Sequence, residues 1–188
     1  MVQAKFDPAL ALKFDLGRGT LSQVGGGARV LLPADVLARL LEGASEQVCR
    51  DVGQQLGTDL GRRVGLAMGD SDTAAPERVL EFLGGEMALM GLGSLGFERW
   101  GRALVFSVVD SPFGTNPSSA DSFMAAVFDG AMLRLYGKTT NSICLGRVGK
   151  RVRFLVSGQS AANRVQGWLD AGVHWGEILS RLQAGGDA

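Results

Sequence analysis

The pattern of apolar and polar positions divides the chain into extended and helical segments that alternate in blocks. Apolar residues three or four apart predict helices over residues 34–68, from 73 or 76 to 90, 123–136 and 161–182. Short apolar runs around glycine-containing turns predict strand pairs over residues 13–24, 97–109 and 138–157, with a further extended piece over 29–32. Because no strand–helix–strand repeat is present, we expect an α+β fold in which an antiparallel sheet packs on long helices.

The first predicted helix carries a ridge of small residues at every fourth position. A glycine inside a helix costs about 1 kcal/mol relative to alanine, so such a ridge calls for a compensating interaction. Close approach of another backbone supplies one, and we expect a packed interface here, either within the chain or between two copies. The sequence leaves open a kink at residues 43–45. The ridge consists of Ser45, Cys49, Gly53, Gly57, Gly61, Gly65 and Gly69.

Length and charge narrow the class of protein. The 188 residues suit one domain with a substantial core. With 19 basic and 19 acidic residues and no basic stripe, the chain lacks the electrostatic footprint of a nucleic-acid-binding or membrane-surface protein. No stretch approaches 18 uninterrupted apolar residues, and the N-terminal stretch does not resemble a signal peptide. We therefore expect a cytoplasmic protein without a membrane span.

Few residues have a chemistry that suits catalysis or metal binding. His174 is the single histidine, and it lies in a predicted helix beside tryptophan rather than near a nucleophile. Cys49 and Cys144 are far apart and suit buried packing, and together with one histidine they do not provide closely spaced zinc ligands. We expect a protein that is not an enzyme and that has no catalytic residue, cofactor or metal.

Residues 91–96 match the glycine pattern G-x-G-x-x-G of dinucleotide-binding proteins. That site requires a strand before the glycines and a helix after them, so that the phosphates meet a helix N-terminus. Here the predicted helix precedes the glycines and the predicted strand follows. We therefore expect these glycines to turn the chain and not to bind a nucleotide.

Aromatic and methionine side chains are frequent in the middle of the chain. Such residues build a hydrophobic core, and they also line adaptable pockets for hydrocarbon or aromatic ligands. The sequence does not separate these two interpretations. The ligand-binding candidates are Phe82, Trp100, Phe106, Phe123, Phe128 and Tyr136.

The last predicted helix is amphipathic and carries two tryptophans on its apolar face. We expect residues 158–188 to pack on the preceding domain or to dock a partner protein, with Trp168 and Trp175 as interface candidates. The apolar face comprises Val165, Trp168, Leu169, Gly172, Trp175, Leu179 and Leu182.

Four stretches together resemble the 4-vinyl-reductase-like domain family, which is related to TRAPP subunits, hydrocarbon-binding proteins and aromatic-sensing domains of bacterial regulators. The resemblance covers residues 1–157. Four groups of residues carry the resemblance. They are the segment from residues 14–19 to residues 29–33, the glycines at 53, 57 and 61, the helix that passes Gly130 and ends at residues 135–137, and Cys144 followed by Arg153-Phe154.

This resemblance implies a TRAPP-like fold that dimerises through helices and binds a hydrocarbon or an aromatic molecule. The chain would then serve as a non-enzymatic binding and dimerisation module in a bacterial-type cytoplasmic signalling or assembly system. Two alternatives stay open. One is a protein scaffold acting through the Trp168/Trp175 helix, and the other is an accessory role in tetrapyrrole vinyl reduction, for which we find neither a cofactor motif nor an acid–base pair.

Sensor members of this family often hold a zinc ion. By spacing, the corresponding positions are Asp121, Asn141, Cys144 and Val152. Only one of the cysteines is kept, and a valine side chain has no metal-binding atom. We expect the zinc site to be lost.

Overall fold

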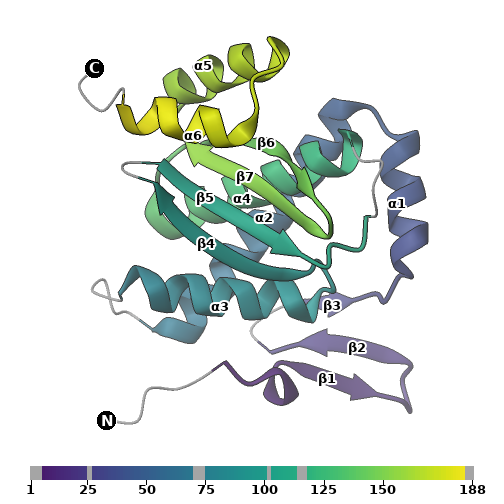
Figure 1. Cartoon of the computed structure of the whole chain (residues 1–188). Helices are drawn as coiled ribbons and strands as arrows, with labels where there is room; N and C mark the ends of the chain where they lie inside the picture. Colours follow the sequence, from purple (N-terminus) through teal and green to yellow (C-terminus); the bar gives the residue numbers. More distant parts are fainter. Residues whose placement is uncertain (1–5, 25–26, 70–74, 101–102, 114–117, 185–188) are drawn as a thin grey trace.

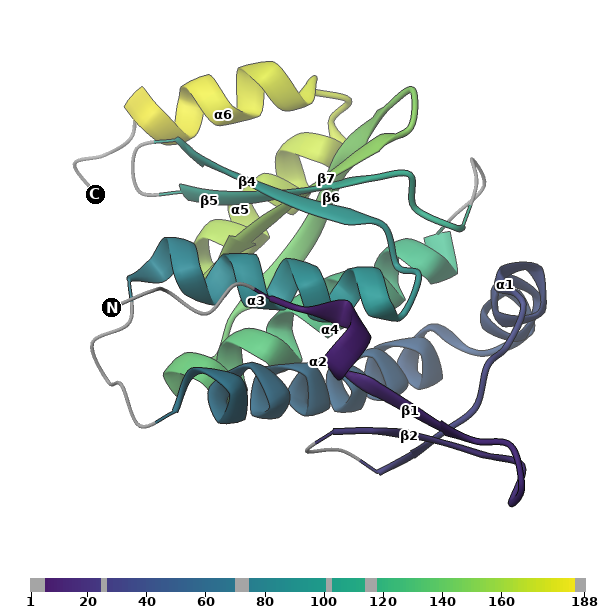
Figure 2. The same ribbon diagram turned by 90° about the horizontal axis from the view of Figure 1, so that it is seen from below.

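The computed structural model describes residues 6–24, 27–69, 75–100, 103–113 and 118–184. Its centre is an antiparallel sheet with the strand order β4-β5-β7-β6. Helices α2, α3 and α4 lie on one side of this sheet, and α5 and α6 lie on the other (Figures 1 and 2). The α+β fold expected from the sequence is confirmed. The strands are β4 (Ser94–Trp100), β5 (Ala103–Val109), β6 (Asn141–Val148) and β7 (Arg151–Ser157), and the helices are α2 (Glu46–Met68), α3 (Pro76–Leu89), α4 (Ser118–Tyr136), α5 (Gln159–Asp170) and α6 (Trp175–Ala184).

The N-terminal part forms a second, small antiparallel sheet beside the main body. A short helical turn, Pro8–Leu10, precedes β1 (Leu12–Asp15), and β1 pairs with β2 (Thr20–Gln23) as the sequence predicts. β3 is limited to Ala28–Arg29, so the predicted extended piece over 29–32 is strand only at its first residue.

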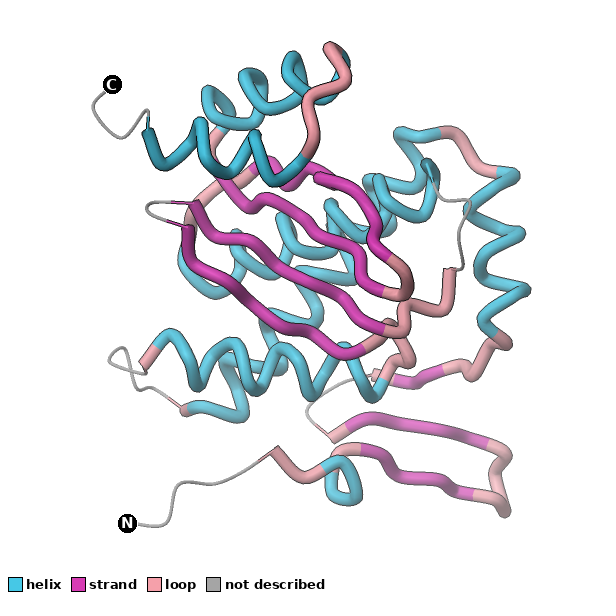
Figure 3. The backbone as a smooth tube through the Cα atoms, in the orientation of Figure 1, coloured by secondary structure: helices cyan, strands magenta, loops and turns pink. Residues whose placement is uncertain are grey.

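The predicted helix over residues 34–68 is in fact two helices, α1 (Ala34–Gly43) and α2. Ala44 is extended, and the Ser45 hydroxyl accepts a hydrogen bond from the Val48 N–H at 3.3 Å. A serine in this position caps a helix because it satisfies one of the free N–H groups of the first turn. Ser45 therefore begins a new helix, and Figure 3 shows the loop that separates the two.

The predicted helix over residues 161–182 is also wrong as one element. It is broken between α5 and α6, where Gly172 has a φ of 76°. The Gly172 N–H donates to the Leu169 carbonyl and the Val173 N–H to the Trp168 carbonyl, each at 2.9 Å. This pair of bonds is the Schellman motif that ends helices at glycine. Trp168 and Trp175 consequently belong to different helices.

Two further boundaries bear on the site. Helix α4 begins at Ser118 and not near residue 123, so Asp121 lies in its first turn rather than before it. It ends as predicted at Gly137, which has a φ of 62°. The predicted helix start at Thr73 lies outside the described residues, and α3 begins at Pro76. Gly91 and Gly93, with φ of 69° and 102°, turn the chain between α3 and β4 as expected, whereas Gly96 lies inside β4 and pairs with Ser107.

The glycine ridge of α2 packs on α4 of the same chain. A Cβ atom at Gly53 or Gly57 would overlap the carbonyl oxygen of Phe123 or Val127, and a Cβ at Gly61 would lie 2.9 Å from the Cβ of Arg134. The other two glycines differ: Gly65 has no neighbour within 4 Å of an added Cβ, and Gly69 ends the helix with a φ of 68°. For the first three glycines the compensating partner is therefore intrachain.

Hydrophobic cores form on both sides of the main sheet. The larger one joins α2, α3 and α4 to the sheet, and the smaller one lies under α5 and α6, around Val105, Leu155 and Ile178. Within the described ranges, no helix is both long and apolar enough to cross a membrane.

Candidate functional site

A cavity of about 530 Å³ opens along β6, the edge strand of the main sheet. Four elements enclose it: β6, the first turns of α4 and α2, and one face of α5. Its walls consist of residues 141–146 of β6, Asp121, Ser122 and Ala125 of α4, Gln159, Ala162, Asn163, Gln166 and Leu169 of α5, and Glu46 and Arg50 of α2.

Hydrogen bonds hold the walls of the cavity in place. The Asp129 carboxylate of α4 accepts from the Ser142 N–H at 2.8 Å and from the hydroxyls of Ser142 and Thr140 at 2.7 Å. Ser122 donates to the Glu46 carboxylate at 3.3 Å, which joins the first turns of α4 and α2. A register shift between Cys144 and Gly146 marks a bulge in β6, a feature that bends an edge strand and redirects its side chains.

An ion pair between Asp121 and Arg147 stands at the α4 side of the cavity. Both side chains are mostly buried. Burial raises the pKa of the Asp121 carboxyl above its usual value, and the positive charge of Arg147 partly opposes that rise. The pair therefore fixes a charged, hydrogen-bonding corner on the α4 side, and Glu46 and Arg50 of α2 add a second charged pair to the lining.

Cys144 lies next to this ion pair, and its thiol is protonated at neutral pH. Burial and the nearby negative charge of Asp121 raise the pKa of the Cys144 thiol to about 12. Since the thiolate and not the thiol is the nucleophile, Cys144 is not an activated nucleophile in this environment. Cys144 itself is partly buried, whereas Cys49 is fully buried and its thiol donates to the Leu41 carbonyl oxygen at 3.4 Å.

The zinc positions of the resembled family do not fit a metal in this chain. Asp121, Asn141 and Cys144 do line one cavity, but the Asp121 carboxylate is paired with Arg147, and Cys144 is the one thiol among the four positions. Val152 is buried in the hydrophobic core. Among the residues that the structure describes, no group of three or more metal-binding side chains occurs.

The remaining lining is mixed in character. Ala125, Ala162 and Leu169 provide apolar surface, whereas Gln159 and Asn163 provide carboxamides along one stripe of α5. The Gln159 Nε2 donates to the Asn163 Oδ1 at 2.7 Å, so these amides are already oriented. A wall with apolar patches and a few oriented polar groups is typical of small-molecule sites.

The six predicted aromatic ligand candidates do not meet in one place. Three of them, Phe106, Phe123 and Phe128, are fully buried in the larger core. The rings of Phe106 and Phe128 pack edge to face there, with 4.9 Å between the ring centres. Phe82 lies elsewhere in that core and packs against Phe6, with 6.0 Å between the two ring centres. Trp100 packs on the opposite side of the sheet, and Tyr136 is 41% exposed at the end of α4.

None of these six residues lines the cavity. Of the cavity residues, Asp121, Asn141 and Cys144 correspond to the zinc positions of the resembled family, and Leu169 belongs to the apolar face predicted for the last helix. The regular spacing of Gln159, Asn163 and Gln166 on a helix was an available signal for the α5 wall. The joining of this wall to α2 and α4 is a tertiary feature, which local patterns do not contain.

The two candidate interface tryptophans pack within the chain. Both border the smaller core. The guanidinium of Arg153 lies 4.2 Å from the Trp175 ring centre, and that of Arg181 lies 5.5 Å from the Trp168 ring centre. His174 is exposed, and its Nδ1 accepts from the Gly176 N–H at 3.2 Å at the start of α6.

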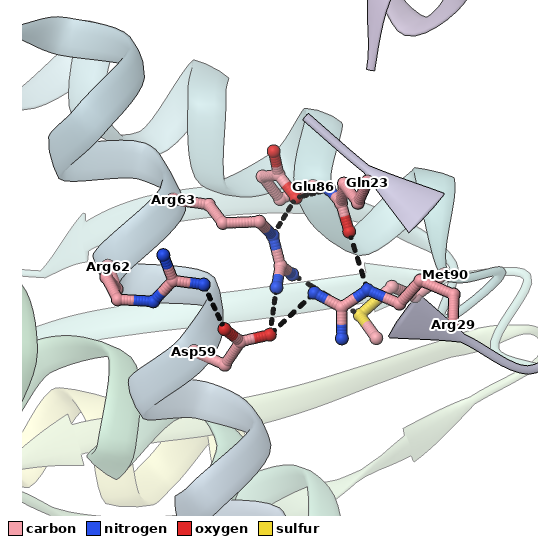
Figure 4. A network of polar contacts seen from close by, with 7 residues as sticks. All are labelled: Gln23, Arg29, Asp59, Arg62, Arg63, Glu86 and Met90. Atoms are coloured by element: carbon pink, nitrogen blue, oxygen red, sulfur yellow. Dashed lines mark hydrogen bonds and ion pairs between the residues drawn. The ribbon is translucent and has the colours of Figure 1, made fainter. Parts of the chain in front are cut away.

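A polar network outside the cavity joins the N-terminal sheet to the main body (Figure 4). Arg63, only 3% exposed, donates from Nε to the Glu86 carboxylate at 2.7 Å and also pairs with Asp59. Gln23 of β2 donates to the same Glu86 oxygen at 2.6 Å. Arg29 of β3 donates to the Asp59 carboxylate at 2.7 Å.

The network is a structural anchor in which three arginines surround two carboxylates. Burial alone would raise the pKa of Asp59, but hydrogen bonds from Arg29 and Arg62 and the charge of Arg63 lower it to about 2. Removing one partner of a buried ion pair leaves the other charge unpaired at a cost of about 3–5 kcal/mol. The network therefore fixes β2 and β3 firmly against α2 and α3.

Comparison with known proteins supports the fold. No protein-family model matches the chain, and no curated protein is significantly similar to it in sequence. Among solved structures, it is similar to the crystal structure of the phenol-responsive sensory domain of the transcription activator PoxR with phenol. The TM-score is 0.64 at 17% sequence identity, with 86% of this chain and 92% of that chain covered. The chain therefore shares the α+β fold of that sensory domain.

Proposed function

We propose that this chain is a non-enzymatic module that binds a small molecule in the cavity between β6, α4, α5 and α2. The cavity itself carries the proposal, since its volume of about 530 Å³ lies within the range of ligand sites. Binding is favoured over catalysis because the Cys144 thiol is held protonated and Asp121 is engaged by Arg147. No lining residue then serves as an activated nucleophile.

The ligand we propose has an aromatic or hydrocarbon body with at least one polar substituent. Ala125, Ala162 and Leu169 accommodate an apolar body, and the amides of Gln159 and Asn163 accept or donate a hydrogen bond. The PoxR domain was crystallised with phenol, a ligand of this chemical class. The shared fold supports the class of ligand without identifying the compound.

We further propose that the module acts as a homodimer in a bacterial-type cytoplasmic signalling or assembly system. The support is the likeness to the sensory domain of a transcription activator. A scaffold acting through Trp168 and Trp175 is the weaker alternative, because both rings border a core of this chain.

The test is a titration of the purified chain with phenol and benzoate, and with toluene as a compound that lacks the polar group. Binding is measured by calorimetry and by the shift in thermal unfolding. Asn163 lines the cavity and is exposed, so Asn163→Phe fills the cavity without disturbing a core. Arg164→Phe adds the same ring at the next exposed position, which does not line the cavity. We expect the wild type and Arg164→Phe to bind phenol with similar affinity. The affinity of Asn163→Phe should be at least ten-fold lower. Equal binding by the two variants would contradict the assignment of the cavity.

A further inference from the structure

The free edge of the main sheet runs along the cavity. β6 is the last strand in the order β4-β5-β7-β6, so it pairs with β7 on one side only. Its residues 141–146 line the cavity between the α4 wall and the α5 wall. A strand at the edge of a sheet presents backbone N–H and C=O groups that no neighbouring strand satisfies. The partners of these backbone groups therefore decide what the cavity can bind.

The register of β6 on β7 fixes which residues turn their backbone groups outward. In an antiparallel pair, alternate residues direct both the N–H and the C=O away from the partner strand. The Ser142 N–H donates to the Asp129 carboxylate of α4 at 2.8 Å, so Ser142 is one of the outward residues. The pairing is regular from Asn141 to Cys144, and Cys144 is therefore the next outward residue.

Helix α4 satisfies the edge at Ser142 but not at Cys144. Asp121, Ala125 and Asp129 are four residues apart and form one stripe of α4. The carboxylates at the two ends of the stripe are engaged, one by the Ser142 N–H and the other in an ion pair. Between them stands Ala125, whose methyl group accepts no hydrogen bond. In the part of the chain that the structure describes, no side chain and no loop carbonyl accepts from the Cys144 N–H.

The cavity lies where an acceptor for this N–H is missing. Cys144 and Ala125 both line it, together with Ala162 and Leu169 of α5. A bound group can accept from the Cys144 N–H and donate to the Cys144 C=O, as a residue of a neighbouring strand does. Because the sheet holds both backbone groups in place, this recognition is preorganised.

A primary carboxamide on an aromatic ring has the matching chemistry. Its carbonyl oxygen accepts and its amide N–H donates, so one neutral group provides partners for both backbone groups of Cys144. A carboxylate only accepts, and a hydrocarbon does neither. The side chains of Ala125, Ala162 and Leu169 offer apolar surface to the ring.

A strand of a partner protein is a poorer match for this edge. Strand addition requires several outward residues in succession. Asp129 already binds Ser142, and the register shift between Cys144 and Gly146 interrupts the ladder directly after Cys144. The available stretch is enough for one carboxamide and too short for a ladder of backbone hydrogen bonds.

We infer that the cavity binds a neutral aromatic carboxamide, whose amide group pairs with the backbone N–H and C=O of Cys144. The inference rests on the proposed function, because it assigns a ligand class and a polar contact to the same cavity. The contact is specific to the edge strand and does not use the Cys144 thiol.

Calorimetric titration of the full chain with three compounds of similar size tests the ligand class. Benzamide has the complete amide group, acetophenone replaces its NH₂ by a methyl group, and benzoate has acceptors only. We expect benzamide to bind at least about ten-fold more tightly than either, because a site built to hydrogen-bond an N–H rejects analogues that lack it. In ¹⁵N–¹H NMR spectra, the Cys144 amide proton should move downfield as benzamide saturates the chain.

Two variants test the contact itself. Cys144→Pro removes the thiol and the N–H, whereas Cys144→Ala removes the thiol and keeps the N–H. Proline is tolerated in an edge strand where the N–H points away from the partner strand. We expect Cys144→Ala to bind benzamide at least about ten-fold more tightly than Cys144→Pro. Circular dichroism establishes that both fold, and if Cys144→Pro does not, the amide proton of the wild type decides.

The outcomes separate this inference from the proposed function. Equal affinities for benzamide, acetophenone and benzoate, all weakened in Asn163→Phe, would overturn the carboxamide contact and leave the cavity as the ligand site. A loss of benzamide binding in Asn141→Ala but not in Cys144→Pro would also overturn the contact, because the side-chain amide of Asn141 would then hold the ligand. Benzamide binding that Asn163→Phe leaves unchanged, or no binding of benzamide or phenol, would overturn both.

Discussion

Gly57 and Gly65 stand on the same ridge of α2 but meet different surroundings. At Gly57 an added Cβ would overlap the backbone of α4, whereas at Gly65 the space is open. The same residue type thus has two energetic roles. Where α4 approaches, the missing side chain permits close helix packing, and at Gly65 it only lowers helix propensity.

We predict opposite effects of alanine at these two positions. Gly57→Ala forces α2 and α4 apart and should lower the free energy of unfolding by about 3 kcal/mol or more. Gly65→Ala should raise it by about 0.5–1 kcal/mol through better helix propensity. Urea unfolding of both variants measures the difference. A similar small effect at both sites would contradict the observed α2–α4 contact.

Arg63 and Glu86 form a buried ion pair whose two charges depend on each other. Arg63→Met leaves the Glu86 carboxylate buried with a single donor, Gln23, and should cost about 3–5 kcal/mol of unfolding free energy. The double variant Arg63→Met/Glu86→Leu removes both charges and should recover part of that loss. Thermal and urea unfolding of the three proteins form the test. A double variant less stable than the single one would show that charge pairing is not the main contribution.

Cys144 should make stability depend on pH in the alkaline range. Its pKa is raised from 9.0 to about 12 in the folded chain, so the folded state holds the thiol proton more tightly than the unfolded state. Stability is therefore fully present below about pH 9 and falls as the pH rises from 9 towards 12. Unfolding free energies of the wild type and Cys144→Ser at pH 7 and pH 10 measure this. The wild type should lose more stability than the variant, and an equal loss would contradict the burial of the thiol.

Helices α5 and α6 form a cover over the second face of the main sheet rather than a free appendage. Val105 and Leu155 of the sheet, together with Val165 and Ile178 of the two helices, form the smaller core. A chain that ends at Gly158 exposes this core. We predict that it loses cooperative thermal unfolding and binds a hydrophobic dye. A truncated chain that unfolds as sharply as the full one would support the alternative that these helices only dock a partner.

Strand pairs and their turns were predictable because their signals are local. The β1–β2 turn has Gly19 with a φ of 64°, and the Asp15 carboxylate accepts from the Arg18 N–H at 3.0 Å within the turn. The break at residues 43–45 was left open and the break at Gly172 was missed, because apolar spacing continues across both. Ser45 served as one member of the small-residue ridge, although its side chain is an N-cap, and Gly172 fitted the apolar face of a helix that it in fact ends.

The cavity was beyond local prediction because four distant segments build it. Only the contact of α2, α4, β6 and α5 brings Glu46, Asp121, Cys144 and Asn163 together. The aromatic candidates were chosen by residue type, and in the fold most of them fill cores. Sequence patterns therefore predicted the fold class and most of the elements, whereas the cavity depends on contacts between segments that lie far apart in the sequence.

In the whole molecule, the first turns of α2 belong both to the cavity wall and to the surface of the chain. Glu46 and Arg50 line the cavity, Cys49 is buried, and Val48 and Val52 are about half exposed.

The most direct measurement is a phenol titration followed by ¹⁵N–¹H NMR spectroscopy of the full chain. We expect saturable changes in amide chemical shift that are concentrated in residues 141–146, in the first turn of α4 and along the α5 face at Ala162 and Leu169. Asn163→Phe should abolish these shifts, and Arg164→Phe should keep them. Saturable shift changes centred instead on Phe106 and Phe128 would contradict the assignment of the cavity as the ligand site. The absence of saturable changes with phenol, toluene and benzoate would contradict the proposed ligand class.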